Sequence, residues 1–210
     1  MRPRLPATWT GLAFALAGIV ILMGIITGEA LYPEVYTTHD NEISDLGATR
    51  PPDSVWFQPS RGIFNATMIA SGVLLGVGGL GVLSLRRSRA AAIAMIAMGL
   101  GVFGVGVFPG EHEAIHPLMA LTAFVAGGVS AVLAYRVVDG PFRFVSAGLG
   151  CVTLVALAFG MFGADTAAFE ELGDGGVERW IAYPTVLWML AFGGYLMAQG
   201  ADARSKWSPS

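Results

Sequence analysis

The chain has 210 residues, of which 54% are hydrophobic and 13% charged, and its mean hydropathy is +0.64. Ordinary soluble domains carry about 25% charged residues, so these values exclude a disordered chain, a nucleic-acid-binding protein and a typical soluble enzyme. The single cysteine excludes a disulfide scaffold and any cysteine-based zinc or iron–sulfur site. The class that remains is a polytopic membrane protein.

Six intervals without charged residues are long enough to cross a bilayer, which takes about 20 apolar residues per helix. The chain is therefore predicted to be all-α, with residues 1–210 forming a single transmembrane domain. The first interval follows Arg2 and Arg4, as in a signal peptide, but its apolar stretch from Trp9 to Ile26 is longer than a signal core and no clean cleavage site follows it. It is interpreted as a retained helix. The six predicted helices lie near residues 9–27, 62–85, 90–108, 117–136, 144–163 and 178–200.

Positive charge predicts the orientation of these helices, because loops on the cytoplasmic side are enriched in arginine and lysine. Nine of the twelve basic residues fall on the side of the N-terminus, and thirteen of the fifteen acids fall on the other. Both termini are therefore predicted to be cytoplasmic, and the protein to be a multi-pass protein of the cell membrane. Eleven arginines against one lysine are typical of a GC-rich prokaryotic genome.

The first extracellular loop, residues 28–61, is predicted to carry structure of its own, since loops longer than about 15 residues are usually structured or functional. Asp40 or Asn41 is a candidate N-cap of a short helix, and Gly47 is its candidate end. Asn65 lies about one turn below the outer end of the second helix, where an amide without partners is costly to bury.

Glycines give the second and third helices small surfaces, as in Gly72-x-x-x-Gly76 and the series from Gly99 to Gly106. Small residues let helix backbones approach closely in lipid. Tight packing within the chain is the favoured interpretation, and a homo-oligomer formed through these faces is the alternative. Membrane lipids are the other expected partners, and no nucleic acid is expected.

No ionisable residue occupies the middle of a predicted span, which argues against proton pumps, voltage sensors and most ion-coupled transporters. Any chemistry is therefore expected at the outer face. The clearest motif there is His112-Glu113-Ala114-Ile115-His116, an H-E-x-x-H pattern in which His112 and His116 would bind zinc. Because Pro117 belongs to the first turn of a helix, the motif is expected to precede the fourth helix, with His116 near its N-cap. A third zinc ligand would come from His39, Asp45 or Glu178, and the alternative is an exposed turn capped by a histidine.

A second cluster opens the last helix, where Glu178 and Arg179 are followed one turn later by Tyr183. Glu178 is expected to complement the helix dipole. Arg179 is expected to pair with an acid such as Asp45 or Glu178, or to bind a lipid phosphate through both of its terminal nitrogens.

Several segments occur in an order that resembles a family of prokaryotic six-span membrane proteins of unknown function. They are Asn41-x-Ile-Ser-Asp-Leu-Gly47, Phe64-Asn65, Phe108-Pro109 with His116, and Glu178-Arg179, and the resemblance covers residues 30–200. The family pattern includes the equivalent of His116 but not of His112 or Glu113. The resemblance therefore favours a site made of Ser44, Asp45, Asn65, His116, Glu178 and Arg179.

Three functions fit these residues. In a membrane-embedded hydrolase or transferase acting on lipid-linked substrates, His116, Asp45 and Glu178 would be catalytic. The binding residues would be Arg179, Asn65, Ser44 and Tyr183. In a lipid or small-molecule transporter or receptor, the same residues would only bind. In a structural protein, they would fasten the loop to the helices. Asp45, His116 and Arg179 are predicted to lie within reach of one another.

Overall fold

The computed structural model describes residues 7–163 and 166–205, and within these ranges the chain is helical throughout its regular structure. The six long helices are α1 (Ala7–Ala30), α2 (Ser60–Leu85), α3 (Arg89–Val107), α4 (Ile115–Leu133), α5 (Phe142–Phe162) and α6 (Ala167–Ser205). Two short 3₁₀ helices, η1 (Ile43–Leu46) and η2 (Ala134–Arg136), accompany them. Each long helix is long and apolar enough to cross a membrane, which confirms the six predicted spans.

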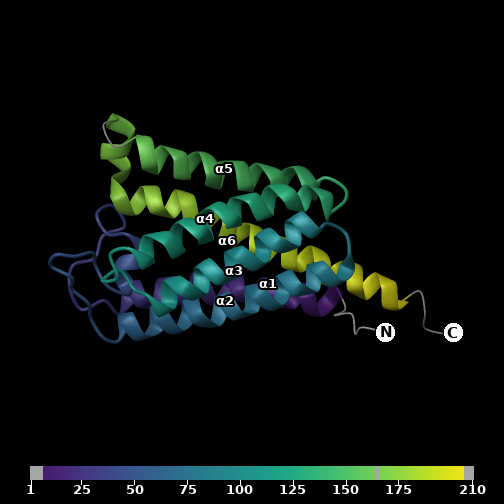
Figure 1. Cartoon of the computed structure of the whole chain (residues 1–210), viewed down its shortest axis with the longest axis horizontal. Helices are drawn as coiled ribbons and strands as arrows, with labels where there is room; N and C mark the ends of the chain where they lie inside the picture. Colours follow the sequence, from purple (N-terminus) through teal and green to yellow (C-terminus); the bar gives the residue numbers. More distant parts are fainter. Residues whose placement is uncertain (1–6, 164–165, 206–210) are drawn as a thin grey trace.

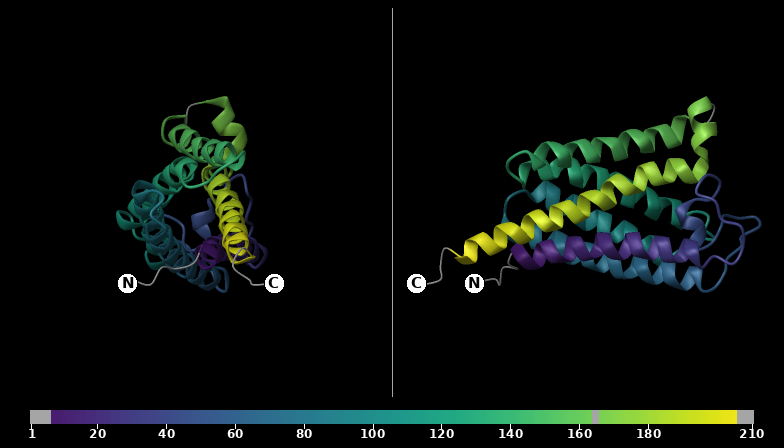
Figure 2. Two further views of the ribbon diagram at one scale, coloured as in Figure 1. Left: turned by 90° about the vertical axis from the view of Figure 1, so that its right-hand side faces the viewer. Right: turned by 180° about the vertical axis from the view of Figure 1, so that it is seen from behind.

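Five of the helices form a ring, and α5 packs against its outside. Going round the ring, α1 packs on α2, α2 on α3, α3 on α4, α4 on α6, and α6 returns to α1. In contrast, α5 packs mainly on α4 and α6, and it lies at the edge of the bundle (Figure 2). We call the end of the bundle that carries the segment 31–59 the loop end, and we call that segment the long loop (Figure 1).

Glycine sets the distances between helices within the ring. A Cβ atom added to Gly72 of α2 would lie 2.5 Å from the backbone nitrogen of Phe103 in α3, and one added to Gly193 of α6 would lie 2.6 Å from the nitrogen of Ala15 in α1. Such distances leave no room for a side chain, so these helices touch backbone to backbone. Most glycines of α2 and α3 are thus used for packing within the chain.

Aromatic side chains fill the half of the ring that lies away from the long loop. Phe14, Trp188 and Phe192 are fully buried, and their ring centroids lie 5.0–6.1 Å apart. The indole nitrogen of Trp188 donates a hydrogen bond of 2.7 Å to the hydroxyl of Ser146 in α5. Because a buried polar group without a partner is costly, this bond ties α5 to the ring.

Three local predictions need correction. Residues 167–177, expected in a loop, belong to α6, which turns sharply at Gly173 with a φ of 66°. At this turn the backbone passes so close to His39 that a side chain on Gly173 would collide with it. The short loop helix is capped by Glu42, not by Asp40 or Asn41, although it does end at Gly47. Finally, α4 begins before Pro117, so His116 lies in its first turn rather than ahead of it.

Candidate functional site

Arg179 is the centre of a polar cluster that fastens the long loop to the helices. Its Nη1 donates to the backbone oxygens of Thr38, Asn41 and Gly175, at 3.2, 2.9 and 2.8 Å. Its Nη2 donates to Glu29 Oε1 at 2.6 Å and to the hydroxyl of Tyr36 at 3.0 Å. The residue is only 8% exposed. A buried guanidinium with this many acceptors holds a fixed geometry, so Arg179 positions the loop.

Two acidic residues of the long loop, Glu42 and Asp45, make further contacts within the loop itself. Asp45 Oδ2 accepts a hydrogen bond of 3.0 Å from the backbone N–H of Glu42, and the Glu42 carboxylate is paired with Arg50 at 2.6 and 2.8 Å. The Tyr36 hydroxyl donates to the backbone oxygen of Glu42 at 2.9 Å. Burial raises the pKa of both Glu42 and Asp45 above the ordinary values of carboxyl groups.

Asp45, His116 and Arg179 were predicted to lie within reach of one another, but each of them bonds to a different protein group. Each of the three has its own partner: the Glu42 backbone for Asp45, the Phe108 backbone for His116 and Glu29 for Arg179. Asp45 also lines neither of the two spaces described next. The residues predicted as one site therefore separate into a fastening cluster around Arg179 and a second group around His116.

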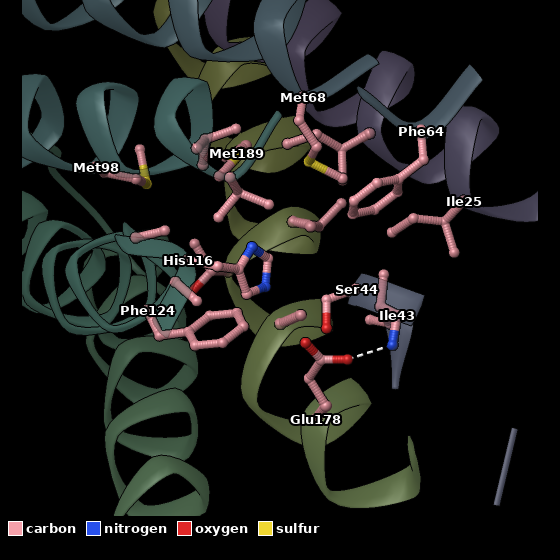
Figure 3. Close-up of a pocket in the computed structure, with 18 residues that line it drawn as sticks. Ile25, Ile43, Ser44, Phe64, Met68, Met98, His116, Phe124, Glu178 and Met189 are labelled. Atoms are coloured by element: carbon pink, nitrogen blue, oxygen red, sulfur yellow. Dashed lines mark hydrogen bonds between the residues drawn. The ribbon is translucent and has the colours of Figure 1, made fainter. Parts of the chain in front are cut away.

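A cavity of about 80 Å³ lies inside the ring, under η1 (Figure 3). Residues of α1, α2, α3, α4 and α6 line it, and nearly all of them are apolar, including Ile25, Met68, Val102 and Met189. At the loop end of the cavity, three polar side chains face the same space (Figure 3). They are Ser44, His116 and Glu178.

His116 presents a hydrogen-bond acceptor to the cavity. Its side chain is almost fully buried, since the residue is 4% exposed. Nδ1 lies 2.8 Å from the backbone oxygen of Phe108, and a carbonyl can only accept. The hydrogen therefore sits on Nδ1, and Nε2 of the neutral ring carries a lone pair. Within residues 7–163 and 166–205, no protein group bonds to Nε2.

Glu178 reaches from α6 to the loop helix. Its Oε2 accepts a hydrogen bond from the backbone N–H of Ile43, the first residue of η1 (Figure 3). Oε1 has no protein partner in the described part of the chain. Beside it, the Ser44 hydroxyl lies 3.4 Å from Glu42 Oε2. Glu178 thus supports η1 with one oxygen and leaves the other facing the cavity.

A cleft of about 180 Å³ adjoins the cavity between α4, α5 and α6. Glu42, Arg50 and Asp174 contribute its charged residues besides Glu178, and Leu157 and Met161 of α5 form part of its apolar wall. The cleft and the cavity share five lining residues: Ser44, His116, Ala120, Phe124 and Glu178. The polar group around His116 therefore lies between an apolar space and a partly charged one.

The other two predicted binding residues lie outside these spaces. Asn65 lies beneath the end of the loop helix, because a Cβ added to Gly47 would be 2.9 Å from Asn65 Oδ1. That oxygen is buried without a partner among the described residues. Tyr183 is half-buried and packs against the hydrophobic core. Neither residue lines the cavity or the cleft.

The H-E-x-x-H residues do not present a zinc site in this arrangement. His112 is exposed and meets the ring of Phe108 edge-on at 5.7 Å, whereas His116 points into the cavity. No three histidine, cysteine or acidic side chains come together as metal ligands in residues 7–163 and 166–205. The proposed third ligands are engaged elsewhere: His39 by Asp40, for example, at 2.6 Å.

Sequence reasoning missed Glu29 and Tyr36, the side-chain partners of Arg179. Glu29 is the first acid after the first charge-free interval, and Tyr32 and Tyr36 follow it at helical spacing. Because few basic residues lie on that side of the membrane, the sequence could have indicated that Glu29 pairs with one of them. The cavity gave no such signal in the sequence, because the residues that line it are typical of membrane helices.

The fold and the site define a multi-pass membrane protein with six candidate spans and a cavity beneath a fastened loop. The chain matches, over residues 7–195, the model of a family described as "Protein of unknown function (DUF998)", and it belongs to that family. This confirms the expectation of a membrane family without an assigned activity. No curated protein and no solved structure matches the chain.

Proposed function

We propose that this protein binds a small amphipathic, lipid-like molecule in the cavity and cleft at its loop end, as a receptor or carrier. The observation that carries the proposal is that two adjoining spaces, one apolar and one partly charged, share Ser44, His116 and Glu178. An amphipathic molecule has the same division, with an apolar chain and a polar end.

The size of the spaces supports a small ligand. An engineered protein cavity of about 150 Å³ binds benzene, and the cleft alone exceeds this volume at about 180 Å³. The apolar cavity behind it accommodates the end of a chain. His116 Nε2 and Glu178 Oε1 have no protein partner among the described residues, so a ligand can hydrogen-bond to both without displacing a protein group.

The polar cluster around Arg179 has a supporting role in this proposal. The terminal nitrogens of Arg179 are fully engaged by protein acceptors, which argues against their binding a lipid phosphate. The cluster instead holds η1 over the cavity, and η1 contributes Ser44 to it. The positive-inside pattern favours a loop end on the outer face of the cell membrane, where the ligand would come from the outer leaflet or the medium.

The proposal is tested by filling the junction of the two spaces. Ala120 lines both of them, so Ala120→Phe should block occupancy while leaving every polar group in place. Ala70→Phe, at an exposed position on α2, is the matched control. Native mass spectrometry of the purified proteins should show a bound small molecule in the wild type and in Ala70→Phe, and its loss in Ala120→Phe. A bound molecule that persists in Ala120→Phe, or none in the wild type, would overturn the proposal.

A further inference from the structure

The charges that line the cleft are mostly negative and mostly unpaired. Glu42 is neutralised by Arg50, whose Nη2 lies 2.6 and 2.8 Å from the two carboxylate oxygens. Asp174 and Glu178 have no basic side chain within ion-pair distance in the described part of the chain. The guanidinium of Arg179, next to Glu178 in sequence, is paired with Glu29 instead. Among the described residues, the cleft thus carries two acids, Asp174 and Glu178, that have no ion-pair partner.

Two of the polar atoms that face the ligand space, on His116 and Glu178, have no hydrogen-bond partner among the described residues. His116 is 4% exposed, and its Nε2 points into the cavity with a lone pair and no protein partner (Figure 3). Oε1 of Glu178 has no protein partner in the described part of the chain. A ligand end that carries donors can bond to His116 Nε2 and to Glu178 Oε1, and a positive charge on that end favours the ionised form of Glu178.

Aromatic rings complete the surroundings of these acceptors. Phe124 lines both the cavity and the cleft, and Phe169 lines the cleft from the first arm of α6. The face of an aromatic ring attracts cations by about 0.5–2 kcal/mol, with the larger values in desolvated sites. Rings beside unpaired carboxylates favour a positively charged ligand over a neutral one.

We infer that the ligand of this site is a cationic amphiphile, a protonated amine with at least one N–H on an apolar chain. Its N–H groups donate to His116 Nε2 and Glu178 Oε1, and its charge supplies the counter-ion that Asp174 and Glu178 lack. Its chain enters the apolar cavity among α1, α2, α3, α4 and α6. This inference rests on the proposed function, because it names the chemical class of the molecule that the cavity binds.

The test compares four probes with the same eight-carbon chain: octylamine, octyltrimethylammonium, octanol and octanoate. At pH 7 a primary amine is protonated, since a lysine amine has a pKa of about 10.4. The full-length protein in lipid nanodiscs is heated with each probe, and the unfolding midpoint is recorded. The Ala120→Phe variant is measured in parallel to remove effects of the probes on the bilayer. Octylamine should raise the wild-type midpoint most, octyltrimethylammonium less because it has no N–H, and octanoate least.

Variants then test which acidic side chain binds the positive charge of the probe. Glu178→Gln keeps an acceptor for the Ile43 N–H but removes the carboxylate, and it should weaken octylamine binding about tenfold or more. Glu171→Gln removes an exposed acid of the same helix arm and should leave binding unchanged. Asp174→Asn provides a second test if Glu178→Gln does not fold.

The outcomes separate the two proposals. Stabilisation by octanol or octanoate as strong as that by octylamine, or octylamine binding unaffected by Glu178→Gln and Asp174→Asn, would overturn the cationic ligand and leave the proposed function standing. If no probe stabilises the wild type more than Ala120→Phe, the proposed function fails as well.

Discussion

Replacing Arg179 by methionine should release the long loop. The change keeps an unbranched apolar side chain but removes five hydrogen bonds and leaves the Glu29 carboxylate without its partner. Removing one member of a buried ion pair typically costs about 3–5 kcal/mol. Arg179 is 8% exposed, so little of this cost is screened by solvent.

Arg50→Met is the matched control, because Arg50 also pairs with a loop acid at 2.6 Å but its side chain is 66% exposed. Exposed ion pairs contribute about 0–1 kcal/mol. The two variants remove the same charge from the same end of the molecule, and they differ in the burial and in the number of bonds that are lost.

Hydrogen–deuterium exchange of peptides covering residues 37–49 measures the effect. A cost of about 3–5 kcal/mol, at 1.4 kcal/mol per factor of ten, corresponds to opening that is at least about 100-fold more frequent. Exchange should accelerate by this factor in Arg179→Met, by less than about tenfold in Arg50→Met, and not at all in peptides from α3. Equal acceleration in the two variants, or none in Arg179→Met, would refute the assignment of Arg179 as the residue that fastens the loop.

Two further predictions concern pH and packing. Because burial raises the folded-state pKa of Glu42 and Asp45, the folded loop binds protons more tightly than the unfolded one. Protection of the loop, corrected for intrinsic exchange, should therefore be greatest below pH ~4 and fall as the pH rises through the folded pKa values, and Asp45→Asn should flatten this profile. Gly72→Ala should lower the unfolding midpoint by forcing α2 away from α3. Gly148→Ala, where a Cβ meets open space, should leave it unchanged or raise it slightly, since alanine favours a helix over glycine by about 1 kcal/mol. An unaffected Gly72→Ala midpoint would contradict the close packing.

The helices were predictable because the bilayer imposes a single strong rule. Stretches of about 20 apolar residues between charges must cross as helices, since backbone polar groups have no other partners in lipid. The rule failed where the protein leaves that environment. Residues 167–177 contain three acids and three glycines, and this composition is typical of a loop. What makes the arm helical is local, including the Thr166 hydroxyl that accepts from the Phe169 N–H at 3.3 Å.

The sequence indicated Glu178, Arg179 and His116 as polar residues of the outer face, but it did not indicate how the fold separates them. Glu178 and Arg179 are adjacent in sequence and so were taken as one cluster. Consecutive residues of an α-helix point about 100° apart, so Arg179 faces the long loop and α1 while Glu178 faces η1 and the cavity. His116 was expected near the N-cap of the fourth helix and lies in the first turn of α4, but only the ring of five helices brings it opposite Glu178.

The peripheral position of α5 has a mechanical consequence. Its polar links to other helices lie towards the end away from the long loop: Ser146 bonds to Ala131 and Trp188, and Thr153 to Thr185. Beyond Thr153, no side chain of α5 hydrogen-bonds to another helix within the described residues, and the buried residues of α5 are confined to Ser146, Gly150 and Thr153. This half of α5 is therefore joined to α6 by apolar contacts, such as that of Phe159 with Phe169, whose ring centroids lie 5.9 Å apart. With Leu157 and Met161 it forms a wall of the cleft, so the width of the cleft depends on these apolar contacts and not on a polar bond.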